Sequence, residues 1–163
     1  MQPEKAERLA KVLMEKHGLT VKGWKLRFNN RTSALGIAVD KGKGKKWVGL
    51  SLPFIRINTK RIVREAILHE IAHALRGVSH GHDLVWRQLA RSIGASGKTQ
   101  FCDSINRPQG IGRWLCGHCK FTSYIYRKPK NRARYACRKC LREHGDTRLN
   151  QTRFTMKLEY YCR

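Results

Sequence analysis

The segment that most constrains the fold is an apolar stretch at residues 66–75, AILHEIAHAL, in which only His69, Glu70 and His73 are not apolar. Apolar residues on all sides of a helix predict that the helix is buried. Two histidines four residues apart lie on one helix face, about one turn apart, so both imidazoles can bind one metal ion. The H-E-x-x-H pattern therefore predicts a zinc site at His69 and His73.

Glu70 follows His69 directly and can reach a water on that zinc. Zinc lowers the pKa of its bound water towards neutrality, and the glutamate takes the proton during attack on a carbonyl. The alternative is a core helix whose polar side chains are satisfied by other protein groups. That interpretation buries two imidazoles and a carboxylate, each at a cost in free energy unless it is partnered, so we favour the metal.

A catalytic zinc usually has three protein ligands and one open position, so a third ligand has to be found. Two candidates, His80 and His82, lie downstream. Gly77 allows the chain to leave the first helix and fold back over the metal, and Asp83 can cap a second helix at about residues 84–93. Geometry alone favours His82 only weakly, so both candidates stay open.

At this point the sequence resembles the SprT-like family of zinc metalloproteases. In that family H-E-x-x-H is followed by a Gly-His step, with an aromatic residue four positions after the histidine. Gly81-His82 followed by Trp86 matches this pattern, whereas His80 has Leu84 at the corresponding position. The resemblance implies that His82 is the third zinc ligand.

The resemblance also implies an activity, which is cleavage of proteins bound or crosslinked to DNA, with Glu70 as general base and then general acid. Such an enzyme would serve DNA–protein crosslink repair, and the compact chain resembles a bacterial or phage member more than a eukaryotic one. The alternative is a non-catalytic, zinc-dependent nucleic-acid-binding adaptor, although structural zincs normally have four protein ligands. A nuclease is disfavoured because Glu65, Glu70 and Asp83 are too few carboxylates for it.

The expected fold class is α+β, with a small antiparallel sheet packed against the zinc helix in a zincin-like domain. Residues 3–16 predict an amphipathic helix. Three short runs linked by turn-rich segments predict an antiparallel meander: residues 24–28, 35–39 and 47–52. Pro53 should end the last strand, and residues 54–58 then lead to the zinc helix near Lys60. The resemblance implies that one strand forms an edge beside the zinc cleft, but the sequence does not say which.

Two clusters of glycine and proline, at residues 94–98 and 108–112, divide the chain. They predict a protease domain at residues 1–95, a linker at residues 96–112 and a basic zinc ribbon at residues 113–163.

The second domain contains two Cys-x-x-Cys pairs separated by seventeen residues. This arrangement is a strong signal for a structural zinc with four thiolate ligands: Cys116, Cys119, Cys137 and Cys140. His118 is expected to be an ordinary turn residue, and Cys102 and Cys162 to be incidental thiols. The insert predicts a hairpin of residues 121–127 and 133–136, and residues 154–161 predict a final strand.

The chain is extremely basic, with 35 Lys and Arg against 11 Asp and Glu and a formal net charge of +24. Such a molecule attracts polyanions, and nucleic acid is the commonest of these in the cell. After residue 96 there are 16 basic and 4 acidic residues, interleaved with Phe121, Tyr124, Tyr126 and Tyr135. Basic residues bind phosphates and aromatic rings stack on unpaired bases. We therefore expect DNA as a partner, single-stranded or duplex, with Phe121 more suited to the ribbon core.

Two further features of the sequence concern contacts with phosphates and the location of the protein in the cell. A lysine- and glycine-rich turn at residues 41–46 either contacts phosphates or is a solvated loop. The sequence has no apolar run long enough to cross a bilayer and does not open with a secretory signal. We expect an intracellular protein, cytoplasmic or nucleoid-associated, without membrane contacts.

Overall fold

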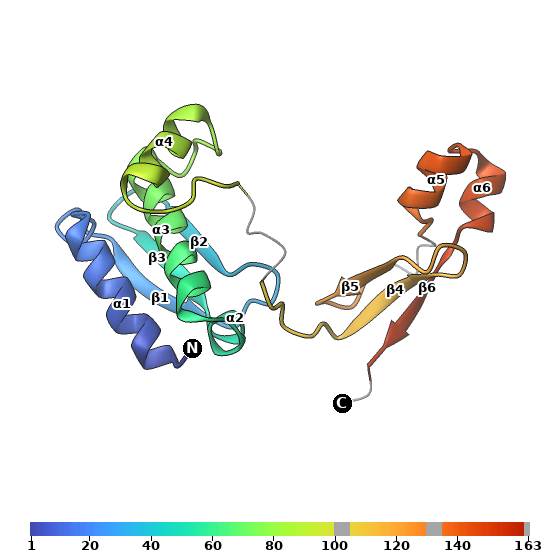
Figure 1. Cartoon of the computed structure of the whole chain (residues 1–163), viewed down its shortest axis with the longest axis horizontal. Helices are drawn as coiled ribbons and strands as arrows, with labels where there is room; N and C mark the ends of the chain where they lie inside the picture. Colours follow the sequence, from blue (N-terminus) through green and yellow to red (C-terminus); the bar gives the residue numbers. More distant parts are fainter. Residues whose placement is uncertain (100–104, 130–134, 162–163) are drawn as a thin grey trace. The chain divides into compact units, whose positions relative to one another are not determined.

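The computed structural model of the chain describes three stretches: residues 1–99, 105–129 and 135–161 (Figure 1). Cys102 and Cys162 lie outside the described residues, as does the first half of the strand predicted at residues 133–136. None of the helices in the described stretches is long and apolar enough to span a membrane.

The chain divides into two compact units, Met1–Pro108 and Gln109–Arg163. Each unit combines helices with a three-stranded sheet, so the α+β fold class is confirmed. The first unit consists of the following elements: α1 (Pro3–Lys16), β1 (Lys25–Asn29), β2 (Gly36–Asp40), β3 (Lys46–Ser51), α2 (Leu52–Ile57), α3 (Lys60–Arg76) and α4 (Leu84–Ser92).

Helix α1 has the bounds that the apolar periodicity predicts. Pro3 occupies the start of the helix, where a missing N–H costs nothing. Its buried side chains form one stripe: Ala6, Ala10, Leu13 and Met14. This stripe packs against α3, which lies beside α1 over the sheet (Figure 1).

The sheet of the first unit is mixed, so the prediction of an antiparallel meander is wrong. Its strand order is β1-β3-β2, with β1 parallel and β2 antiparallel to β3. The last strand takes the central position and is the most deeply buried of the three, with Val48 and Leu50 fully buried. Strand β1 carries exposed Lys25 and Arg27, which suit an edge.

The segment after Pro53 also differs from the prediction. Residues 52–57 form the short helix α2, not a connection that merely leads on to the zinc helix. Ser51 caps this helix, its Oγ accepting the N–H of Phe54 at 3.4 Å. Proline suits the first turn of a helix as well as it breaks a strand, so the same residue ends β3 and begins α2.

The core of the first unit lies between the sheet and the helices α1 and α3. Four side chains of α3 are fully buried in it: Val63, Ile67, Leu68 and Ile71. From the sheet side it receives alternate residues of β3, since Val48 and Leu50 face the helices. Helix α3 is thus fixed along its length against the sheet.

The second unit is built on a sheet of order β5-β4-β6 in which both pairings are antiparallel. Its elements are β4 (Gly112–Cys116), β5 (Thr122–Ile125), α5 (Arg138–His144), α6 (Arg148–Arg153) and β6 (Met156–Tyr160). The predicted final strand corresponds to β6. Strand β5 pairs with β4, because the Cys-x-x-Cys turn at 116–119 closes that hairpin. Of the predicted partner strand, the described residue Ala136 bridges to Thr155 and not to β5.

Asn58, at the end of α2, hydrogen-bonds to a later segment of the chain at Asn106. Its side chain is 3% exposed, and its Nδ2 donates to the carbonyl oxygens of Phe54 at 2.9 Å and Asn106 at 2.8 Å. Its Oδ1 accepts the N–H of Asn106 at 3.0 Å, and Nδ2 of Asn106 donates to the carbonyl of Ile57 at 2.9 Å. Residue 106, assigned to a linker by sequence, is therefore part of the first unit.

Replacing Asn58 by alanine should destabilise the first unit. The change removes three hydrogen bonds and leaves backbone groups of Asn106 without their partners, which should lower the free energy of unfolding by roughly 1–3 kcal/mol. Urea unfolding followed by tryptophan fluorescence measures this, with the exposed Asn30→Ala as control. Equal unfolding midpoints for the two variants would contradict the role of Asn58.

Candidate metal centres

Helix α3 carries the predicted zinc pattern and has well-defined ends. Thr59 caps its start, with Oγ1 accepting a backbone N–H of the first turn at 3.5 Å. Gly77 ends it with a φ of 101°, a conformation that L side chains rarely adopt. Between these caps His69 and Glu70 are buried, at 8% and 6% exposed.

Three histidine rings converge on one point. Nε2 of His82 lies 3.0 Å from Nε2 of His69 and 3.1 Å from Nε2 of His73. The ligand atoms of all three histidines lie within 4.8 Å of one another. A tetrahedral zinc with Zn–N bonds of about 2.0–2.1 Å would separate its nitrogens by about 3.3–3.4 Å, so the three nitrogens lie close to the spacing of zinc ligands.

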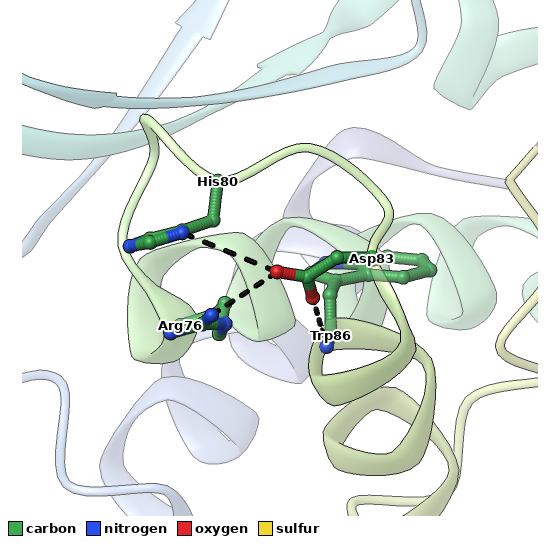
Figure 2. Close-up of polar contacts among 4 residues, drawn as sticks. All are labelled: Arg76, His80, Asp83 and Trp86. Atoms are coloured by element: carbon green, nitrogen blue, oxygen red, sulfur yellow. Dashed lines mark hydrogen bonds and ion pairs between the residues drawn. The ribbon is translucent and has the colours of Figure 1, made fainter.

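His80, the other candidate for the third ligand, faces a different group. Its Nδ1 lies 4.0 Å from Oδ2 of Asp83, and its side chain is 47% exposed. Figure 2 shows the His80 ring and the Arg76 guanidinium on the same carboxylate oxygen of Asp83. The structure therefore brings His82, and not His80, to the histidines of α3. The ligand role of His82 stays a prediction.

Asp83 holds the loop that carries His82. Its Oδ1 accepts the backbone N–H of Trp86 at 2.7 Å, which caps α4 as predicted, and its Oδ2 accepts from Nη2 of Arg76 at 3.1 Å (Figure 2). These hydrogen bonds, the backbone one first, lower the pKa of Asp83. The ionised carboxylate thus connects the start of α4 to the end of α3.

Trp86 packs against all three histidines. Its ring centroid lies 4.7 Å from that of His69, 5.0 Å from that of His73 and 4.4 Å from that of His82. The tryptophan is fully buried. Such packing fixes ring orientation around a metal, as hydrogen bonds from outer groups do. Only the family motif drew attention to this residue in the sequence.

The histidines are held in the neutral form. Burial, followed by the neighbouring histidines, lowers the pKa of His69 to about 3. Burial also lowers the pKa of His73 and of His82. A hydrogen bond with the backbone of His80 acts in the opposite direction on His73 and fixes its ring. At neutral pH each imidazole therefore offers the lone pair that a metal ion needs.

Glu70 lies against strand β2. Burial raises the pKa of its carboxyl to about 8, while a hydrogen bond with the backbone of Ala38 opposes that rise. A Cβ added at Gly36 would lie 2.6 Å from Cγ and 2.8 Å from Oε1 of Glu70, so glycine leaves the space that the carboxyl fills. A carboxyl with a pKa near neutrality is suited to accepting and releasing protons near pH 7.

His69 and Glu70 open onto one cavity of about 380 Å³. Its other lining residues come from the loop before β2 and the first residue of that strand, from α2 and from the segment after α4: Ser33, Ala34, Leu35, Gly36, Phe54, Thr99, Ile105 and Arg107. Sequence analysis missed most of these. An isolated glycine in a strand pattern is a signal of close approach that could have identified Gly36. Ile105 and Arg107 carry no such signal, because they lie in a stretch without periodicity.

The second unit contains a cluster of four cysteines. The Sγ atoms of Cys116 and Cys140 lie 3.8 Å apart, and those of Cys119 and Cys137 lie 3.7 Å apart. A tetrahedral zinc with Zn–S bonds of about 2.3 Å would place its sulfurs about 3.8 Å apart. A hydrogen bond with the backbone of Phe121 lowers the pKa of Cys119 to about 7, which favours the thiolate that binds metals.

His118 lies in the turn between Cys116 and Cys119, as predicted, and contacts the cysteine cluster. Its Nδ1 lies 3.6 Å from Sγ of Cys140, and its ring lies edge-on to Phe154 and His144. The four-cysteine cluster and the three-histidine cluster can each hold a metal ion, and their donor types suit zinc.

Comparison with known proteins identifies a family. A family model described as the SprT-like family matches residues 4–107, more than half of the chain. The match begins in α1, includes the three converging histidines and ends at Arg107, which lines the cavity. A search of the curated proteins found no match.

The two histidine candidates can be separated by metal content. His82→Ala should reduce bound zinc from two ions per chain to one, because a ligand of the histidine cluster is lost. His80→Ala should retain both ions, since its ring faces Asp83. Elemental analysis of the purified variants measures the ratio. Loss of one zinc from the His80 variant alone would contradict the assignment.

Gly36→Ala should displace Glu70 without removing the metal. The new Cβ would overlap the carboxyl side chain, so we expect a displaced Glu70 and a destabilisation of roughly 1–3 kcal/mol in urea unfolding, with zinc content unchanged. Gly81→Ala is the matched control because an added Cβ there meets nothing within 4 Å. Equal unfolding midpoints for the Gly36 and Gly81 variants would show that the glycine does not make room for Glu70.

Proposed function

Since this chain belongs to the SprT-like family, we propose that it is a zinc-dependent endopeptidase that hydrolyses peptide bonds of proteins bound or crosslinked to DNA. The family is associated with a zinc metalloprotease-like domain. The observation that carries the proposal is the convergence of three histidine Nε2 atoms beside a cavity that Glu70 also lines. A site with three protein ligands has a position open for solvent or substrate, which structural zinc sites lack.

Each side chain has a role in this proposal. His69, His73 and His82 hold the zinc, which when bound supplies a Lewis acid and lowers the pKa of its water. Glu70 accepts a proton from the attacking water and then donates it to the leaving amine. Its buried position beside β2 holds the carboxyl at the cavity.

Strand β2 suits the binding of an extended polypeptide. It is an edge strand, since its only partner among the described strands is β3. A peptide that pairs with an exposed edge gains backbone hydrogen bonds without a specific sequence. Glu70 packs against this strand at Gly36 and bonds with the backbone of Ala38. A substrate on β2 would therefore pass the general base, with little demand on side-chain identity.

DNA is the proposed recruiter. The formal charge of +24 favours a polyanion, and the second unit exposes aromatic rings among its basic residues. Phe121 is 47% exposed, Tyr124 54% and Tyr135 45%. The expectation that Phe121 belongs to the ribbon core is wrong, because Phe154 and Met156 fill that core with the cysteines. With DNA as partner, the protein would act inside the cell.

The test is a protease assay on a DNA-binding protein, with and without DNA and with and without a chelator. Cleavage by the wild type should require zinc and increase with DNA, and Glu70→Gln should lower it by at least about 10²-fold, the usual contribution of a general base. Glu65→Gln is the matched control on the same helix, because an amide oxygen can still accept the hydrogen bonds from Ser96.

The alternatives give different results in the same assay. DNA binding without any cleavage by the wild type would favour the adaptor. Cuts in plain DNA without a protein substrate would favour a nuclease. Glu70→Gln activity at the wild-type rate would contradict the proposed mechanism.

A further inference from the structure

The sheet of the first unit has one face whose side chains belong to none of the apolar clusters formed by the described residues. Side chains alternate along each strand, and the face with Leu26, Phe28, Ala38, Val48 and Leu50 packs on the helices. The residues between them face the opposite way: Lys25, Arg27 and Asn29 on β1, Ile37 and Val39 on β2, and Trp47 and Gly49 on β3. We call these seven residues the outer sheet face.

The apolar members of the outer sheet face are only half covered. Ile37, Val39 and Trp47 are half-buried, and none of them belongs to an apolar core cluster of the described residues. Gly49 is opposite Ile37 in the pairing register and adds no side chain. The face is thus a shallow apolar strip in which Trp47 is the largest side chain.

Cations surround this tryptophan. The Arg27 guanidinium carbon lies 4.5 Å from the Trp47 ring centroid, and Nζ of Lys41 lies 5.7 Å from it. Both distances are within the range of cation–π attraction. The arrangement combines an aromatic ring with two positive charges held over it, and the planar Arg27 guanidinium extends the surface on which a base can stack.

The charge of the face has one sign. None of its seven residues is acidic, and the adjoining turn adds Lys41, Lys43 and Lys45, all exposed. The nearest acidic residue in β2, Asp40, belongs to the opposite face by alternation and is already paired, with Nζ of Lys46 at 3.4 Å and the N–H of Gly42 at 2.9 Å. A ligand on this face therefore meets uncompensated positive charge.

The positive charge of the outer sheet face indicates which class of ligand can bind there. A second copy of this chain, with its formal charge of +24, would bring repulsion, and so would the second unit, with 14 basic and 3 acidic residues at positions 109–163. A polyanion is required. A half-covered tryptophan beside a guanidinium is the platform on which unpaired bases stack, whereas duplex bases are hidden in their stack.

We infer that the outer sheet face binds single-stranded nucleic acid, with bases stacked at Trp47 and Arg27 and phosphates bound by Lys25 and the lysines of the turn at residues 41–46. This site goes beyond the proposed function, because it requires neither metal centre and lies on the first unit. Glu70 packs at Gly36 and Ala38 of β2, which alternate with the outward residues, so strand β2 separates the site from the cavity.

The test measures binding of the full-length, zinc-loaded chain to a fluorescein-labelled oligothymidylate of about 12 nucleotides by anisotropy over a range of salt concentrations. The variant Lys25→Gln/Lys41→Gln should bind about tenfold more weakly, and the slope of log affinity against log salt should fall by about 1.4 for two lost phosphate contacts. The control, Lys5→Gln/Arg8→Gln, removes two exposed cations of α1 and the same charge.

Two substitutions of Trp47 test base stacking separately from charge. Trp47→Leu should weaken binding by at least about fivefold, whereas Trp47→Phe keeps a ring and should retain most of the affinity. Thermal unfolding of both variants shows whether each is folded, and the double variant, which changes surface charges only, remains informative if Trp47→Leu does not fold.

A crosslinking map gives an independent result. Oligothymidylate carrying 5-iodouracil, irradiated on the wild type, should crosslink to the tryptic peptide that contains Trp47. A map confined to residues 109–163 would overturn the proposal. So would equal affinities and equal salt slopes for the two double variants.

Discussion

The first unit depends on accommodating three ionisable side chains within an apolar helix. A buried imidazole or carboxylate costs free energy unless it has partners, and α3 buries His69 and Glu70 almost completely. His82 and Trp86 from the next segment complete the surroundings of the two histidines. The backbone of Ala38 in β2 supplies a hydrogen-bond partner for the buried carboxyl of Glu70. The positions of α4 and β2 are therefore tied to the polar residues of α3 as much as to the apolar core.

Local signals predicted much of this arrangement. The helix at residues 3–16, the cap at Asp83 and the cysteine pairs each depend on residues near in sequence, and the structure contains all three. Strand order was not predictable in the same way, because it depends on which strand is buried most deeply. Helix α2 was missed since Pro53 fits a strand end and a helix start equally well. The cavity wall at Ile105 and Arg107 depends on tertiary contacts of Asn106, which leave no periodic pattern.

The two units are stabilised by different interactions. The first has a continuous core between a sheet and two helices, with thirteen buried residues in its main cluster. Among the described residues of the second, the cluster of buried side chains adds Phe154 and Met156 to the cysteines. A module with so little apolar surface gains much of its folding free energy from metal bonds to its thiolates. Metal would therefore serve catalysis in one unit, under the proposed function, and structure in the other.

The hydrogen bonds between Asn58 and Asn106 have a consequence for how the protein can be divided. The glycine-rich segment near residue 95 looks like a natural place to cut, yet Thr99, Ile105 and Arg107 complete the cavity from beyond it. A fragment ending near residue 95 would keep all three histidines of the metal cluster but lose Thr99, Ile105 and Arg107 from the wall of the cavity. The shortest fragment that contains every residue lining the cavity extends through Arg107, so residues 105–107, just before the second unit, belong to the candidate site of the first.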